Sequence, residues 1–167
     1  EIEVLATGLN FKDVLFTTGL LRQQPGEAPL QLGLECAGRI TRVGKNVTEF
    51  APGEDVMAVL NGGFVQYARV ESDCVVRKPA HCRIEQAAAL PIAYLTAYYA
   101  LVVRANLQPG ERVLIHSAAG GVGLAALHIA KRCGAQIFAT AGSEQKRDYL
   151  LSLGVHAVAD SHDEQFA

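Results

Sequence analysis

A glycine-rich turn between two apolar runs is the feature that most restricts how this chain can fold. The β-branched residues Val113 and Ile115 before the turn favour a strand, and the alanine-rich residues after it favour a helix. A second strand and a second helix are expected to follow. The expected elements are a strand at residues 113–117, a helix at 121–133, a strand at 136–140, a helix at 143–153 and a short strand at 156–160. This order predicts βαβ units on a parallel sheet.

The turn itself reads AAGGVG and resembles a phosphate-binding fingerprint. Ala118, Gly120 and Gly123 occupy the three slots of G-x-G-x-x-G, with alanine in place of the first glycine. In such a site one glycine lets the backbone approach a pyrophosphate, and another lets the helix pack against the strand. The predicted cofactor-binding residues of the turn are Ala118, Ala119, Gly120, Gly121, Val122 and Gly123. The alternative is a tight turn that binds no ligand.

The end of the second strand of this unit predicts which cofactor is bound. An Asp or Glu here usually accepts hydrogen bonds from the ribose hydroxyls of NAD, but this strand ends in Thr-Ala-Gly. Ser143 can cap the next helix and face the ribose, and Lys146 and Arg147 lie one turn further on, where they can pair with a phosphate. The sequence therefore predicts a pocket for a 2′-phosphate and NADPH as cofactor. Alternatively, the two cations are ordinary solvated charges.

Composition and charge argue against several classes of protein. A net charge of −2 gives no electrostatic reason to expect binding to nucleic acid or to an acidic membrane. Four cysteines without a C-x-x-C pair indicate neither a disulfide framework nor a zinc ribbon, which favours a cytoplasmic location. The apolar residues 87–103 are interrupted by Pro91 and Thr96, so we expect a buried helix there and no membrane span.

The first half of the chain has a different pattern from the second. Short β-rich runs are separated by Gly, Pro and Asn turn signals, which predicts a compact all-β unit. The runs are residues 39–44, 55–60, 64–70 and 73–78. We therefore expect two domains, a β-rich domain at residues 1–89 and a nucleotide-binding domain at residues 90–167.

The parallel sheet of the second domain looks incomplete. Sheets of this type usually have about six strands, and only two clear strands and a short third one precede Ala167. Such a partial sheet would leave a strand edge and apolar faces uncovered. We therefore expect the chain to be a fragment that folds poorly alone.

Several stretches together resemble the medium-chain dehydrogenase/reductase superfamily, and within it the enoyl reductase domains of polyketide synthases and animal fatty acid synthases. The matching stretches are GLNFKDVLFTTG, LGLECAGRITRVG, PGEDVMAV, AYLTAYYALV, GERVLIHSAAGGVGLAALHIAK and ATAGSEQKRDYL. The resemblance implies a mixed fold, in which a GroES-like β-barrel domain precedes the first part of a Rossmann doubly wound parallel sheet.

The zinc ligands of related alcohol dehydrogenases are missing from this sequence. The family's G-H-E segment reads Gly33-Leu34-Glu35, and leucine cannot bind zinc. The NFKD segment also has no cysteine, so we expect no metal site and a zinc-independent enzyme. Glu35 is either a remnant of the zinc motif or a structural residue paired with a backbone donor, and we favour the second interpretation.

The resemblance implies an NADPH-dependent enoyl reductase that transfers hydride to the β-carbon of an α,β-unsaturated acyl thioester. Asn10 and Thr96 match family positions near the nicotinamide, and Phe11, which has no acidic proton, can only shape the pocket. The proton donors proposed for the family lie beyond Ala167. The implied partners are an acyl carrier protein and other synthase domains, with a homodimer possible. Two alternatives stay open, a free-standing quinone oxidoreductase and a nonenzymatic NADPH-binding structural or interaction protein.

Overall fold

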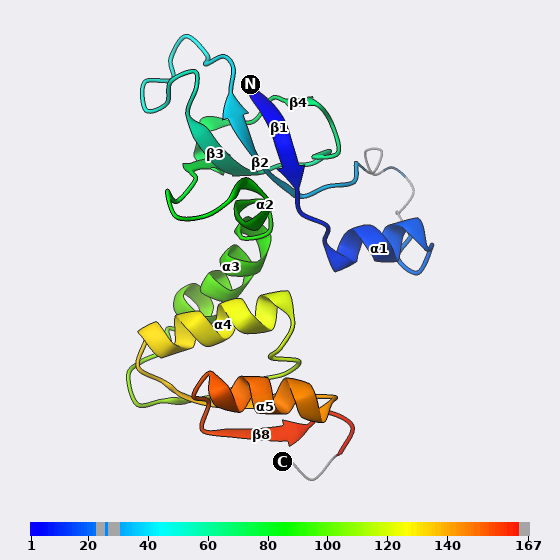
Figure 1. The fold of residues 1–167 in the computed structure, drawn as a ribbon, viewed down its shortest axis with the longest axis vertical. Helices are drawn as coiled ribbons and strands as arrows, with labels where there is room; N and C mark the ends of the chain where they lie inside the picture. Colours follow the sequence, from blue (N-terminus) through cyan, green and yellow to red (C-terminus); the bar gives the residue numbers. More distant parts are fainter. Residues whose placement is uncertain (23–25, 27–30, 164–167) are drawn as a thin grey trace. The chain divides into compact units, whose positions relative to one another are not determined.

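The computed structural model describes residues 1–22, 26 and 31–163 of the 167-residue chain. The chain divides into two compact units, Glu1–Ile92 and Ala93–Ala167 (Figure 1). Each unit is built around its own sheet, the first antiparallel and the second parallel. The predicted mixed fold class is thereby confirmed. The exact domain limits, 1–89 and 90–167, stay predictions.

The first unit holds a five-stranded antiparallel sheet in the order β4-β1-β2-β3-β5. Its strands are β1 (Ile2–Thr7), β2 (Glu35–Ile40), β3 (Asp55–Val59), β4 (Tyr67–Ala68) and β5 (Val75–Arg77). The central strand β2 is covered on both faces, which explains its run of small and apolar residues. Cys36 and Ile40 pack into one core cluster, and Ala37 packs into another with Ala87 and Ala88.

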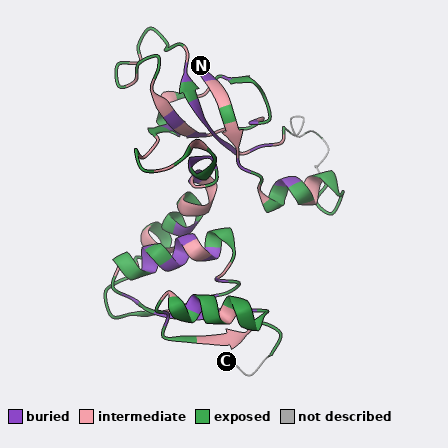
Figure 2. Ribbon diagram, in the orientation of Figure 1, coloured by how far each residue is buried: buried purple, intermediate pink, exposed green. Residues whose placement is uncertain are grey.

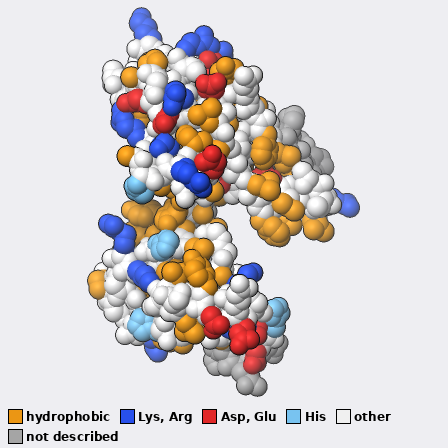
Figure 3. Space-filling model, in the orientation of Figure 1, with side chains coloured by type: hydrophobic (Ala, Val, Ile, Leu, Met, Phe, Trp, Pro, Cys, Tyr) orange, Lys and Arg blue, Asp and Glu red, His pale blue; other side chains and the backbone are white. Residues whose placement is uncertain are grey.

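The prediction of an all-β first unit was wrong, because this unit also contains helices. They are α1 (Phe11–Thr17), α2 (Ile84–Ala87) and a short 3-10 turn, η1 (Ser72–Cys74). The α1 helix begins after Asn10, whose backbone N–H donates to the Asp13 carboxylate at 2.9 Å, an arrangement that stabilises a helix start. Figure 3 shows hydrophobic side chains gathered over α1, where Phe11 is 74% exposed.

The second unit holds the predicted parallel sheet, in the order β6-β7-β8. Its elements are β6 (Arg112–Ile115), α4 (Gly121–Arg132), β7 (Gln136–Ala141), α5 (Glu144–Ser152) and β8 (Ala157–Asp160). Both crossovers step along the sheet in the same direction, so right-handed connections put α4 and α5 on the same face. Leu127, Ile137 and Leu150 are fully buried between these helices and the sheet, and Figure 2 shows the buried side of α4.

The apolar tract before this sheet is buried on one side only. It forms α3 (Pro91–Tyr98) and a π-helical turn, η2 (Tyr99–Arg104). Ala97 belongs to the core, whereas Leu95 and Tyr99 are more than half exposed, so the prediction of a buried helix was only partly correct. By length and composition alone, Ile84–Arg104 could cross a membrane, with a mean hydropathy of 1.4.

Candidate functional site

The glycine-rich turn connects β6 to the N-terminus of α4, as the sequence predicts. Gly120 is the N-cap residue of α4, and its carbonyl accepts from Leu124 N at 2.8 Å to close the first turn. The N–H groups of Gly121, Val122 and Gly123 precede that bond, so they have no acceptor within the helix. Such N–H groups, together with the helix dipole, favour an anion.

Gly123 allows close contact between α4 and the turn. A Cβ atom at this position would lie 2.6 Å from Ala118 Cα and 2.6 Å from the Ser117 carbonyl oxygen, closer than real Cβ contacts. Gly121 is different, because nothing lies within 4 Å of a Cβ built there. Only one of these two glycines is therefore required by packing.

The turn is also fixed by a hydroxyl group that no motif in the sequence indicates. Thr140, near the end of β7, is completely buried, and its hydroxyl accepts from Ser117 N at 3.3 Å. Its carbonyl accepts from Ala118 N at 3.0 Å. Ser117 has a φ of 50°, a left-handed conformation that is unusual for serine, and nothing in its local sequence predicts it. Thr140 holds this strained turn against the end of β7.

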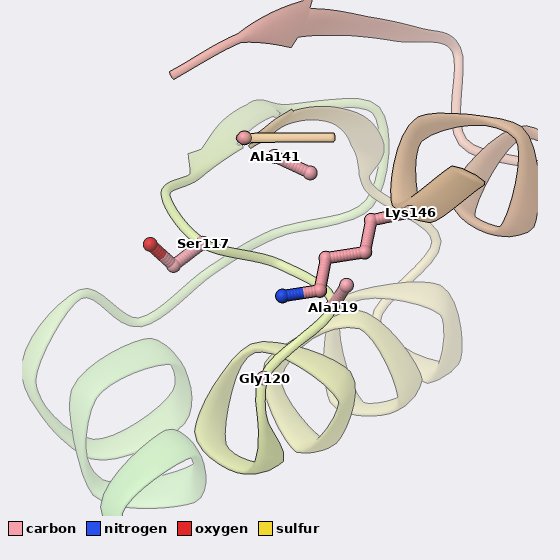
Figure 4. Close-up of a pocket in the computed structure, with 6 residues that line it drawn as sticks. Ser117, Ala119, Gly120, Ala141 and Lys146 are labelled. Atoms are coloured by element: carbon pink, nitrogen blue, oxygen red, sulfur yellow. The ribbon is translucent and has the colours of Figure 1, made fainter. Parts of the chain in front are cut away.

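A pocket of about 130 Å³ lies between the turn and the start of α5 (Figure 4). It is lined by Ser117, Ala119, Gly120, Ala141, Gly142 and Lys146. The Lys146 side chain extends from α5 toward the turn with Ala119 and Gly120. A whole ligand site usually occupies about 300–1,000 Å³, so this pocket could hold only part of a larger ligand. Within residues 1–22, 26 and 31–163, no carboxylate lines this pocket.

Ser143 and Arg147 make internal contacts at the same end of the sheet. Ser143 is the N-cap of α5, and its hydroxyl accepts from Lys146 N at 3.4 Å, as predicted. Arg147 turns toward the neighbouring strand, where its guanidinium donates to Asp160 at 2.8 Å and to the Ala141 carbonyl at 3.1 Å. Arg147 therefore neutralises a carboxylate and is absent from the pocket lining.

Asp160 is a second residue whose role no motif in the sequence indicates. It ends β8 and pairs in register with Ala141 at the end of β7. Hydrogen bonds from the backbone and ring of His162 hold its pKa below the ordinary value, and the charge of Arg147 adds to this effect. The carboxylate is therefore ionised and paired beside the pocket.

The residues predicted near the nicotinamide lie in other elements. Asn10 is partly buried at the start of α1, and its side-chain Nδ2 donates to the buried Glu35 carboxylate at 2.9 Å. Thr96 is exposed on α3. Glu35 also accepts from Ile92 N at 2.8 Å, which confirms the interpretation of Glu35 as a residue paired with a backbone donor.

The histidine of α4 contacts a tyrosine and is not part of a metal site. His128 is exposed, and its Nδ1 lies 2.7 Å from the Tyr94 hydroxyl. Among residues 1–22, 26 and 31–163, no group of three or more His, Cys, Asp or Glu side chains is arranged to hold a metal ion.

Known families and proteins match both units of the chain. The family "Alcohol dehydrogenase GroES-like domain" matches residues 1–80, and "Zinc-binding dehydrogenase" matches residues 121–167. A phenolphthiocerol/phthiocerol polyketide synthase of Mycobacterium tuberculosis is 46% identical over 167 residues, which are 100% of this chain and 8% of that protein.

Solved structures agree with these matches. The structure of CurK enoyl reductase superposes with a TM-score of 0.90 and 44% identity over 97% of this chain and 51% of that one. Mycobacterial Rv1454c complexed with NADPH gives a TM-score of 0.83 and 29% identity over 95% of this chain and 49% of that one. The chain thus spans about half the length of these structures. It belongs to the medium-chain dehydrogenase/reductase superfamily, and within it to the enoyl reductase domains of polyketide synthases.

Proposed function

We propose that this chain is part of a zinc-independent enoyl reductase that uses NADPH to reduce an α,β-unsaturated acyl thioester carried by an acyl carrier protein. Its similarity to polyketide synthases and to CurK enoyl reductase supports the reaction type. The observation that carries the cofactor assignment is Lys146 beside the glycine-rich turn, in a pocket that no carboxylate of the described residues lines. The NADPH complex of the related mycobacterial protein is consistent with this assignment.

The residues of the turn fit a dinucleotide phosphate. The first-turn N–H groups of α4 are suited to the pyrophosphate, and the contact at Gly123 keeps the helix close enough to present them. Lys146 would pair with the 2′-phosphate through a charge-assisted hydrogen bond. Ser143 would contribute its hydroxyl at the ribose.

At the reacting end, NADPH supplies the hydride that adds to the β-carbon of the enoyl thioester. Asn10 would contact the nicotinamide through its carboxamide, and Thr96 would offer a hydroxyl. Phe11 would shape the acyl pocket. The other domains of a polyketide synthase would supply the carrier-bound substrate.

Turnover by the complete enoyl reductase that contains this chain tests the reaction type. We expect the absorbance of NADPH to fall when a crotonyl thioester is added. Oxidation with a quinone in place of the thioester would favour a quinone oxidoreductase. Tight NADPH binding without turnover of either substrate would favour a structural or interaction protein.

Two neighbouring substitutions test the cofactor assignment. Lys146→Ala should weaken NADPH binding by roughly tenfold or more, the value of a charge-assisted hydrogen bond, and leave NADH binding unchanged. Arg147→Ala should lower the melting temperature because it removes the ion pair with Asp160 and the hydrogen bond to the Ala141 carbonyl. Lys45→Ala, at an exposed position of the first unit, is the control and should change neither quantity. Equal weakening of NADPH and NADH by Lys146→Ala would refute the assignment.

A further inference from the structure

A histidine ring lies directly against the wall of the pocket that Lys146 lines. Gly142, which also lines this pocket, directly follows the last residue of β7. A Cβ atom built on Gly142 would lie 2.6 Å from Cε1 of His162 and 3.4 Å from its Nδ1, so the imidazole ring packs on this glycine. The His162 side chain is 77% exposed, so most of the ring is open to solvent.

Asp160 fixes the orientation of this ring. Its Oδ1 lies 3.0 Å from Nδ1 of His162 and accepts from the backbone N–H of the same residue at 2.9 Å. Its Oδ2 accepts from Arg147 at 2.8 Å. The ionised carboxylate can only accept hydrogen bonds, so Nδ1 must carry a proton that it donates to Asp160. The other ring nitrogen, Nε2, then faces away from Asp160.

The position of Nε2 follows from the contact with Gly142. Nε2 is bonded to Cε1, the ring atom nearest to Gly142, and therefore lies on the same edge of the ring. Lys146 and this edge of His162 thus border one pocket of about 130 Å³, Lys146 as a lining residue and His162 through the glycine against which it packs. All of these residues belong to the second unit.

We propose that His162 is a further specificity-determining residue, which donates from Nε2 to the same 2′-phosphate that Lys146 binds. The proposal rests on the NADPH assignment made above. Both ring nitrogens donate only in the imidazolium form, and anions on two sides of the ring, Asp160 and the phosphate, stabilise that form. A cofactor without the 2′-phosphate offers Nε2 no such acceptor. His162 therefore favours NADPH over NADH.

Two nucleotide fragments isolate the phosphate contact, because 2′,5′-ADP carries the 2′-phosphate and 5′-AMP does not. His162→Asn keeps an NH₂ group for Asp160 but has no atom in place of Nε2, so it removes only the proposed contact. In titrations of the complete enoyl reductase, this variant should bind 2′,5′-ADP about three- to tenfold more weakly, as for an exposed charge-assisted hydrogen bond. Its affinity for 5′-AMP and its melting temperature should not change. His162→Arg, which keeps a cationic donor, should retain the preference for 2′,5′-ADP.

Two further variants separate this proposal from the cofactor assignment on which it rests. His81→Asn, the same change at an exposed position of the first unit, is the control and should bind both fragments normally. Lys146→Ala should weaken 2′,5′-ADP and not 5′-AMP. Normal binding of 2′,5′-ADP by His162→Asn, or equal weakening of both fragments, would overturn the role of His162. If Lys146→Ala also bound 2′,5′-ADP normally, the NADPH assignment would fall as well.

Discussion

Two glycines in the same turn, Gly121 and Gly123, should respond in opposite ways to an added side chain. A Cβ atom at Gly123 would lie 2.6 Å from both Ala118 Cα and the Ser117 carbonyl oxygen, whereas nothing lies within 4 Å of a Cβ at Gly121. Both positions are in the first turn of α4, so helix propensity affects them similarly. Gly121→Ala, at a position with open space, is therefore the control for Gly123→Val.

The size of the effect follows from this geometry. Ordinary contact begins at 3.4 Å, so α4 and the turn must separate by about 0.8 Å to admit the new atom. Both contacting atoms are backbone, and Ala118 is completely buried, so no side chain can move aside. Overpacking of this kind costs roughly 1–3 kcal/mol. Valine adds two methyl groups, and we expect a loss of about 2–3 kcal/mol and a melting temperature lower by about 5–10 °C.

Thermal melting and NADPH titration of the complete enoyl reductase measure both consequences. Gly123→Val should melt earlier and bind NADPH weakly, because the displaced helix no longer presents its N–H groups at the same place. Gly121→Ala should be neutral or stabilising by up to about 1 kcal/mol, the propensity difference between alanine and glycine. Normal melting and binding by Gly123→Val, or equal damage from Gly121→Ala, would refute this reasoning.

Two further substitution and labelling experiments test the interior of each unit. Thr140→Val should lower the free energy of unfolding, measured by chemical denaturation, by about 1–3 kcal/mol, because it leaves Ser117 N without its acceptor. Thr140→Ser keeps the hydroxyl and should therefore keep most of the stability of the unsubstituted protein. Burial, and secondarily the charge of Glu35, raises the pKa of Cys36 to about 11. Iodoacetamide at mildly alkaline pH should therefore label the exposed Cys74 and spare Cys36 in the folded protein. The stabilisation from protonated Cys36 is complete below its ordinary pKa of about 8.5 and is lost as the pH rises through about 11. Equal labelling of both thiols, or equal stability of the two Thr140 variants, would contradict these accounts.

The elements of the second unit could be predicted because their signals are local. Helix α4 ends in Lys131 and Arg132 before Gly134, whose φ is 73°, and these are preferences of the helix end itself. Ser143 caps α5 through a bond to a residue three positions away. Each of these features can be read within a few residues, and each is found in the structure.

The first unit was less predictable because its strands depend on distant partners. Strand β2 pairs with β1 and β3, so its limits are set by residues far away in the sequence. Residues 41–44 continue the β-rich pattern but have no place in the sheet. The sequence pattern did not predict helix α1, because the start of this helix depends on the Asp13 carboxylate, which also accepts a hydrogen bond from Gly33 N. Local propensity carries little of this information.

Lys146 and Arg147 show why a basic pair cannot be assigned a role from sequence alone. Adjacent residues on a helix point about 100° apart, so two neighbouring cations can have different surroundings and different roles. Lys146 lines the pocket, and Arg147 reaches Asp160, which ends the next strand. Without Arg147, the Asp160 carboxylate would place an uncompensated negative charge beside a site proposed for a phosphate. Arg147 would therefore support NADPH binding indirectly, by neutralising Asp160, while Lys146 would make the contact that distinguishes NADPH from NADH.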